Sequence, residues 1–144
     1  MNVLHVLFKV SDVQYALPAS DVLHMESFTG ATPVPGTPPY VTGLMQIRQR
    51  VVPIVSLRAR FGLPPIEPNL DTRVVVVQSG ARAVGLLVDS AREIMTISTD
   101  RFQPPPELIA EQAAGYVKSV LQTGARLLML IDFEKVIGDE VQGA

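Results

Sequence analysis

The chain of 144 residues contains two histidines, His5 and His24, and no cysteine. Histidine, cysteine and carboxylate side chains are the usual protein ligands of zinc. Neither histidine has another such ligand three or four residues away, and a zinc site would need both histidines together with carboxylates. We therefore expect two ordinary, partly exposed histidines and no metal site.

Motifs for nucleophilic catalysis and phosphate binding do not occur in the sequence. It has no Gly-x-Ser-x-Gly and neither of the common glycine-rich phosphate loops. Two pairs of acidic residues, Asp89 with Glu93 and Asp132 with Glu134, are close enough along the chain to face one another. Such pairs are more often helix caps or solvated surface groups than an acid–base pair. The sequence thus predicts a protein that is not an enzyme and uses no cofactor.

The segment 44–66 is unusual because it contains four arginines and no acidic residue. The four are Arg48, Arg50, Arg58 and Arg60. They could pair with acidic residues from elsewhere in the chain, or they could form a docking patch for an acidic protein surface, because guanidinium pairs bidentately with carboxylates. A small ligand or single-stranded nucleic acid is a less favoured partner. Phe61 is the only aromatic residue nearby, Trp is absent and the formal net charge is −2.

The elements that must position these residues are mostly strands. Apolar runs of strand length recur between turn-forming residues, and few of them alternate strictly, which predicts strands buried on both faces. These runs are Val3–Val10, Val51–Val55, Arg73–Val77, Ala83–Val88 and Leu127–Ile131. The clearest hairpin joins the segments 73–77 and 82–88. Two short helices are expected, from Pro106 to about Ala114 and from Asp132 to about Ile137, the second with Asp132 as its N-cap.

Composition indicates one globular domain, with 47% hydrophobic and 18% charged residues. No apolar run approaches the roughly 18 residues needed to span a bilayer. The N-terminus also lacks the basic region of a signal peptide. We expect a cytoplasmic protein that does not insert into a membrane.

The chain contains an internal repeat. The segment 40–62 aligns without a gap to the segment 116–138, so that Tyr40 meets Tyr116, Arg50 meets Arg126 and Gly62 meets Gly138. Ser56 and Asp132 then fall at the same helix-cap position, and upstream the segment 15–21 resembles the segment 84–90. Any two hairpins followed by a helix share some of this pattern. The length of the gapless match nevertheless favours two structurally related halves.

Several ordered segments resemble the CheW family of chemotaxis adaptors. In the first half these are Tyr15-Ala-Leu-Pro-Ala-Ser-Asp-Val22, Pro33-Val-Pro-Gly-Thr-Pro-Pro-Tyr-Val-Thr-Gly43, and Leu44-Met-Gln-Ile-Arg48 followed by Val51-Val-Pro-Ile-Val-Ser-Leu-Arg58. In the second half the segments 73–77, 84–89 and 131–136 continue the pattern. The resemblance runs in order from about residue 4 to residue 140. No single motif is specific, but the ordered set is.

This resemblance implies an all-β fold with short helices, made of two related SH3-like β-barrel subdomains packed side by side. It implies a single CheW-like domain over residues 1–144. The first barrel would span roughly 12–66, the second roughly 72–131, and a C-terminal helix roughly 132–140.

The resemblance also implies a function, which is to act as a non-enzymatic adaptor. Proteins of this family couple the regulatory domain of a CheA-type histidine kinase to the cytoplasmic tips of methyl-accepting chemoreceptors. The protein would then lie in the cytoplasm, associated with membrane receptor arrays through its partners. The alternative is a CheW-like paralogue that serves another chemosensory pathway, such as one that controls surface motility.

The partner-binding residues implied by the resemblance and the arginine patch are Val22, His24, Gly43, Leu44, Arg48, Gln49, Arg50 and Arg58. Val22 and Leu44 are expected to offer apolar contact to a receptor helix, and Arg48 a charge-assisted hydrogen bond. Three positions depart from the family pattern. His24 stands where the family has an acidic residue, Gln49 where it usually has glycine, and Ser56 where it usually has aspartate.

Overall fold

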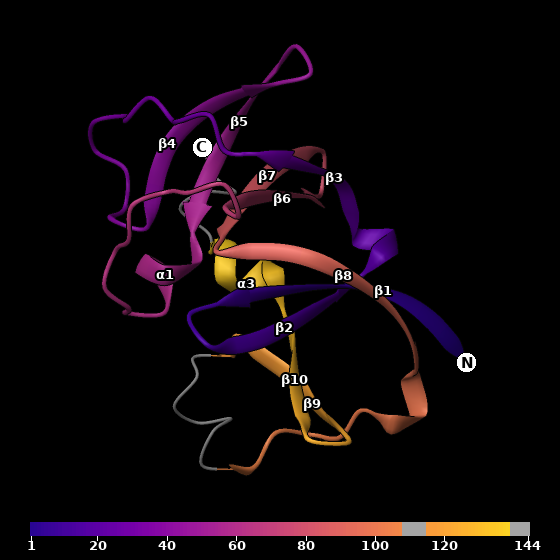
Figure 1. Ribbon diagram of the computed structural model, residues 1–144. Helices are drawn as coiled ribbons and strands as arrows, with labels where there is room; N and C mark the ends of the chain where they lie inside the picture. Colours follow the sequence, from indigo (N-terminus) through magenta and orange to yellow (C-terminus); the bar gives the residue numbers. More distant parts are fainter. Residues whose placement is uncertain (108–114, 139–144) are drawn as a thin grey trace.

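The computed structural model describes residues 1–107 and 115–138, and it consists mainly of two five-stranded sheets that pack against each other (Figure 1). The strands are β1 (Asn2–Val10), β2 (Val13–Pro18), β3 (Val22–Ser27), β4 (Val41–Ile47), β5 (Arg50–Ser56), β6 (Arg73–Ser79), β7 (Arg82–Val88), β8 (Ser90–Ser98), β9 (Val117–Thr123) and β10 (Arg126–Ile131). The short helices are α1 (Leu57–Arg60) and α3 (Phe133–Ile137), with 3-10 turns η1 (Ala19–Asp21) and η2 (Thr99–Arg101). The predicted mostly-β class and the hairpin of β6 and β7 are confirmed.

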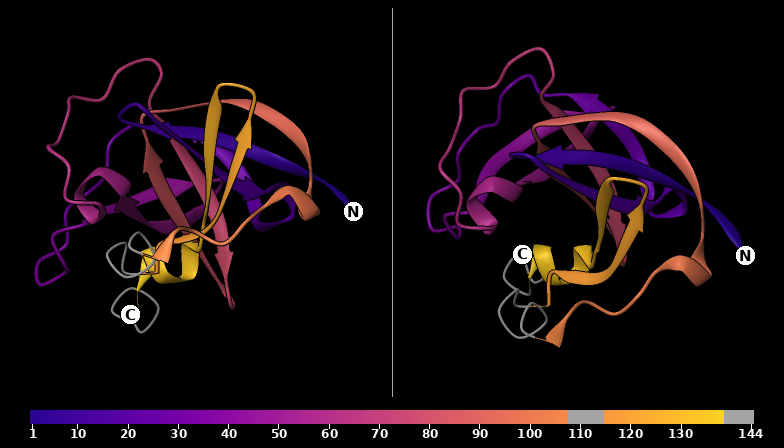
Figure 2. Two further views of the ribbon diagram at one scale, coloured as in Figure 1. Left: turned by 90° about the horizontal axis from the view of Figure 1, so that it is seen from below. Right: turned by 60° about the horizontal axis from the view of Figure 1, so that its bottom comes forward.

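The division of strands between the sheets differs from the expected division at residues 12–66 and 72–131. One sheet has the order β8-β1-β2-β10-β9, and the other has the order β3-β6-β7-β5-β4. Each sheet therefore combines a hairpin from one half of the chain with three strands from the other half. Figure 2 shows the result, with the N-terminal hairpin of β1 and β2 beside the hairpin of β9 and β10.

The sequence repeat corresponds to repeated structure. The elements β4, β5 and α1 have β9, β10 and α3 as their counterparts, with boundaries that agree to within one residue. The Ser56 hydroxyl accepts a hydrogen bond from the Ala59 amide, and the Asp132 carboxylate accepts the equivalent bond from the Lys135 amide. The second predicted helix is thus confirmed, together with its cap. The first, Pro106 to about Ala114, lies almost entirely outside the described residues.

Backbone bridges draw the edges of each sheet toward one another. Thr32, which follows β3, exchanges two hydrogen bonds with Leu44 of β4 (2.8 and 2.9 Å). Gln103, which follows β8, makes the equivalent exchange with Val120 of β9 (2.9 and 2.8 Å). Because β3 with β4 and β8 with β9 are the outer strands of the two sheets, these bridges curl each sheet back on itself.

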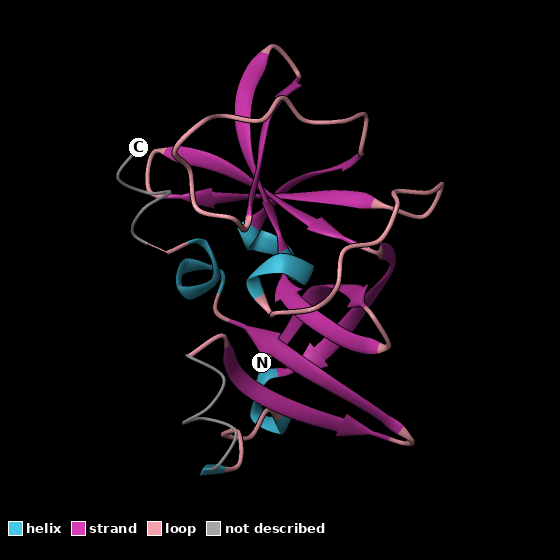
Figure 3. Ribbon diagram, turned by 90° about the vertical axis from the view of Figure 1, so that its left-hand side faces the viewer, coloured by secondary structure: helices cyan, strands magenta, loops and turns pink. Residues whose placement is uncertain are grey.

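Both faces of the central strands are buried, as expected from their unbroken apolar runs. The largest cluster lies between the sheets and includes Phe8 and Leu17 of one sheet and Val75 of the other. A smaller apolar cluster lies within each curled sheet, around Ile54 in one and Leu128 in the other. Figure 3 shows the short helices at the level where the two sheets meet. The buried residues Leu57 of α1 and Ile137 of α3 belong to the shared cluster.

Arg60 joins the two halves at this junction. Its guanidinium carbon lies 3.9 Å from the ring centroid of Tyr40 and 5.2 Å from that of Tyr116. Its Nε donates a hydrogen bond to the Val136 carbonyl at the end of α3 (2.7 Å). A cation placed over aromatic rings and at a helix C-terminus is stabilising in both respects. Arg60 is therefore part of the fold and is not available to a docking patch.

Candidate functional site

The tip of the β4–β5 hairpin carries three of the predicted site residues and projects from the top of the molecule in Figure 1. Ile47 pairs with Arg50, so that Arg48 and Gln49 form a two-residue loop. Both loop residues have positive φ, 49° for Arg48 and 68° for Gln49. This is the type I′ geometry, which usually takes Asn-Gly, because side chains other than Asn, Asp and Gly are strained there. Gln49 therefore adopts the left-handed backbone for which glycine is the usual residue.

The strain at Gln49 leads to a stability prediction. Replacing it by glycine (Gln49→Gly) removes the steric cost of the left-handed backbone, and we expect the free energy of unfolding to rise by about 0.5–1 kcal/mol. Denaturant unfolding measures this change. A Gln46→Gly variant on the extended strand β4 serves as the control, where glycine should destabilise. A loss of stability in Gln49→Gly would contradict the assigned turn.

Arg48 is held by an ion pair within the chain. Its Nε donates to Oε1 of Glu26 on β3 at 2.9 Å, and the two side chains are 64% and 27% exposed. An exposed pair of this kind contributes little to stability. Its consequence is positional, because it directs the Arg48 guanidinium toward β3.

Strand β3 presents a different set of side chains on each face. Val22 and His24 are half-buried, and Val22 packs against the core cluster between the sheets. Leu23 and Met25, which alternate with them along the strand, are 40% and 38% exposed. The site residues predicted from the sequence are the inward-facing ones of this strand, and the exposed apolar pair is not among them. The alternation of side chains along a strand would have pointed to it.

Gly43 is a structural requirement of the site and not a contact surface. It is buried at a bulge of β4, with φ of 147°. A Cβ atom at this position would lie 2.2 Å from the carbonyl oxygen of Thr32. Gly43 therefore allows the Thr32–Leu44 bridge, while the Leu44 side chain is 37% exposed.

An apolar hollow of about 480 Å³ lies beside the β4–β5 hairpin. Leu44, Val51 and Pro53 contribute apolar side chains to it. Arg50 and Arg82 also line it, and none of the described residues that line it is acidic. The hollow thus combines an apolar floor with positive charge.

Arg58 does not join the other predicted residues. It lies on α1, beyond the far end of β5, and donates three hydrogen bonds to the carboxylate of Asp89 (2.8–3.2 Å). A further bond from Nη1 reaches the Pro64 carbonyl (3.0 Å). The side chains of Arg58 and Asp89 are 17% and 20% exposed. With Arg58 and Arg60 both held within the fold, the four arginines do not form one patch.

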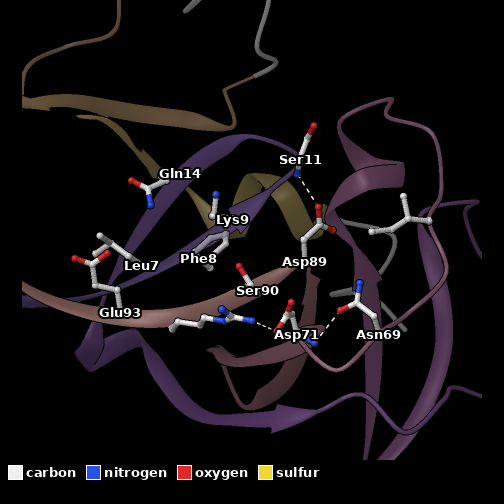
Figure 4. Close-up of a pocket in the computed structure, with 12 residues that line it drawn as sticks. Leu7, Phe8, Lys9, Ser11, Gln14, Asn69, Asp71, Asp89, Ser90 and Glu93 are labelled. Carbon is white, nitrogen blue, oxygen red and sulfur yellow. Dashed lines mark hydrogen bonds and ion pairs between the residues drawn. The ribbon is translucent and has the colours of Figure 1, made fainter. Parts of the chain in front are cut away.

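A second hollow, of about 520 Å³, is polar and lies where β1, β2 and β8 face the connection from α1 to β6 (Figure 4). Its carboxylates have partners in the chain. Asp71 forms an ion pair with Arg92, Asp89 accepts a hydrogen bond from the Ser11 amide (2.7 Å), and Glu93 pairs with Arg126. Among its described lining residues, this hollow therefore offers no pair of carboxylates that is free for acid–base chemistry.

Within residues 1–107 and 115–138, no group of three or more His, Cys, Asp or Glu side chains is arranged to hold a metal ion. No helix in the same part of the chain has the length and hydropathy to cross a membrane.

Comparison with known proteins gives consistent results. A family model described as "CheW-like domain" matches residues 4–141. The chain is 32% identical over 139 residues to "Chemotaxis protein CheW" of Rhizobium meliloti (strain 1021), covering 96% of this chain and 90% of that protein. It is 29% identical over 135 residues to "Chemotaxis protein CheW" of Bacillus subtilis (strain 168), covering 94% and 86%. The crystal structure of the scaffolding protein TtCheW from Thermoanaerobacter tengcongensis has a similar fold, with a TM-score of 0.87, 24% identity and coverage of 98% and 91%.

Proposed function

The chain belongs to the CheW-like domain family, and we propose that it couples the regulatory domain of a CheA-type histidine kinase to the cytoplasmic tips of methyl-accepting chemoreceptors. Membership of this family makes it a chemotaxis coupling adaptor and not an enzyme. The match over residues 4–141 is the observation that carries the function. The names of the relatives do not favour a role in a separate pathway over a role in chemotaxis.

For the receptor we propose the surface formed by β3 and the hairpin tip. Leu23 and Met25 are exposed and supply apolar contact. Arg48 supplies an exposed guanidinium, which can pair with a carboxylate of the partner. An amphipathic helix with an acidic residue beside its apolar face has the matching chemistry. In this proposal Val22 and His24 support β3 from the inward side, and Gly43 supports the hairpin.

Coupling requires that both partners bind at once. The kinase domain therefore needs a surface that leaves β3 and Arg48 free. The coupling free energy between the two bound partners, and not a chemical step, is the output of such a protein.

The receptor surface is tested with Arg48→Ala. Calorimetric titration with a receptor signalling-tip fragment from the same organism should show binding about three- to tenfold weaker than wild type, because a charge-assisted hydrogen bond is lost. Binding to the kinase regulatory domain should stay unchanged. Arg101→Ala is the control, since Arg101 is an exposed arginine of η2, which follows β8 of the other sheet. Normal receptor binding by Arg48→Ala would overturn the assignment of this surface.

A further inference from the structure

Arg126 and Arg50 occupy equivalent positions in the two related halves of the chain, but their surroundings differ. In one half Arg126, the first residue of β10, is fixed by the chain itself. It donates two hydrogen bonds to Oε1 of Gln14 on β2 (3.1 and 2.9 Å) and one to each carboxylate oxygen of Glu93 on β8 (3.0 and 2.7 Å). Gln14 and Glu93, both labelled in Figure 4, lie on the two strands that flank β1 in this sheet.

In the other half the equivalent residues cannot make this network. Arg50 is the counterpart of Arg126, since each begins the second strand of its hairpin. Glu93 pairs with Leu7 of β1, and His24 occupies the equivalent place opposite Val76 of β6. Gln14, the other partner of Arg126, stands opposite Lys9 in the hairpin of β1 and β2.

Ala83 takes the place of Gln14, because it stands opposite Gln78 in the second hairpin as Gln14 does opposite Lys9. Histidine and alanine therefore replace the glutamate and glutamine that hold Arg126. Neither a methyl group nor an imidazole offers the paired oxygens that a guanidinium fork requires.

In the part of the chain that the structure describes, Arg50 is consequently left without an acidic partner. Within the described residues its guanidinium makes no hydrogen bond and no ion pair, whereas Arg48, two residues before it, is paired with Glu26. Arg50 lines the apolar hollow beside Leu44, Val51 and Pro53, and the described lining of that hollow contains no acidic side chain. Val51 is 67% exposed, which is unusual for a strand residue of its size.

We propose that the hollow beside β5 binds a segment of a partner protein in which a carboxylate lies next to aliphatic side chains. The carboxylate pairs with the Arg50 guanidinium, as Glu93 pairs with Arg126 inside the chain, and the aliphatic side chains cover Leu44, Val51 and Pro53. This deepens the proposed adaptor function and rests on it for the identity of the partner. The chemistry of the contact rests on Arg50 and the hollow alone.

The contact is tested first without either natural partner. The probe is a short peptide of alternating leucine and glutamate, and its leucine–glutamine counterpart is the control. NMR of the arginine Nε–H groups should show the Arg50 signal shifting with the glutamate peptide only, while the Arg126 signal stays in place as an internal reference. Equal shifts of both signals, or no shift at Arg50, would overturn the proposal.

The natural partners are then tested with Arg50→Gln, using the kinase regulatory domain and the receptor tip fragment separately. Binding of one of them should weaken about tenfold, as expected for the loss of an ionic hydrogen bond. Arg101→Gln is the charge-matched control. The double variant His24→Glu with Ala83→Gln rebuilds the internal network around Arg50 and should weaken the same partner by a similar factor.

The outcomes separate the two proposals. If the wild-type chain binds neither fragment, the adaptor partners are wrong, while the peptide result still decides the contact at Arg50. If the wild type binds a fragment and Arg50→Gln binds both as tightly as wild type, the adaptor function stands and the contact at Arg50 is refuted.

Discussion

Replacing Gly43 by alanine is expected to destabilise the protein by about 3 kcal/mol or more. The added Cβ atom would lie 2.2 Å from the Thr32 oxygen and 2.6 Å from the Thr32 carbonyl carbon. These are backbone atoms, so no side-chain rotation relieves the clash. The φ of 147° adds strain for any residue with a side chain. The variant must therefore break the Thr32–Leu44 bridge or distort β4.

Ser119 provides the matched control for this experiment. It lies on β9 at the equivalent bulge, where the pairing of β9 with β10 shifts as that of β4 with β5 does. Ser119→Ala should change the free energy of unfolding by less than about 0.5 kcal/mol. Denaturant unfolding of both variants measures the difference. A Gly43→Ala variant as stable as wild type would show that the bridge does not constrain this strand.

Removing the Arg58 guanidinium is expected to cost about 2 kcal/mol at neutral pH. Arg58→Met keeps the length of the side chain but leaves the half-buried carboxylate of Asp89 without its cation and without three hydrogen bonds. Arg92→Met is the control. Both side chains of the Arg92–Asp71 pair are exposed, so its loss should change the free energy of unfolding by no more than about 0.5 kcal/mol. Equal losses of stability in the two variants would contradict the conclusion that partial burial makes the Arg58–Asp89 pair the more stabilising one.

The Arg58 effect should also depend on pH. Burial by itself would raise the pKa of Asp89. The hydrogen bonds from Arg58 and from the Ser11 amide lower it, as does the charge of Arg58. Together they outweigh burial, so that the pKa of Asp89 lies below its ordinary value of 3.8. A carboxyl with a lowered pKa in the folded state stabilises the protein above its ordinary pKa and loses this effect as the pH falls through the folded value. The difference between wild type and Arg58→Met should therefore be largest at neutral pH and shrink as the pH falls below 3.8.

The repeat in the sequence predicted local structure better than it predicted the partition of strands. The gapless match of 40–62 to 116–138 anticipated the paired hairpins, the Ser56 and Asp132 caps and the equivalent helices. Which hairpin joins which sheet depends on contacts such as the parallel pairing of β2 with β10. These residues are far apart in the chain, so local patterns carry no information about their pairing. The exchange of hairpins also implies that neither half has a complete sheet of its own.

In the candidate site, too, the interactions that matter join residues far apart in the sequence. The four arginines look alike in the sequence, because the segment around them has no acidic residue. Their partners Glu26, Asp89 and the carbonyl of Val136 come from distant segments. Only in the structure does Arg50 differ from the other three, since the residues that would have paired with it are His24 and Ala83.

The most direct test of the adaptor function is control of kinase activity by receptors. Autophosphorylation of the CheA-type kinase is measured with receptor-containing membranes from the same organism, with and without this chain. The proposed function predicts that kinase activity responds to the receptor ligand only when the chain is present, and that Arg48→Ala reduces this response. Ligand-dependent kinase activity that is the same with and without the chain would contradict a coupling role.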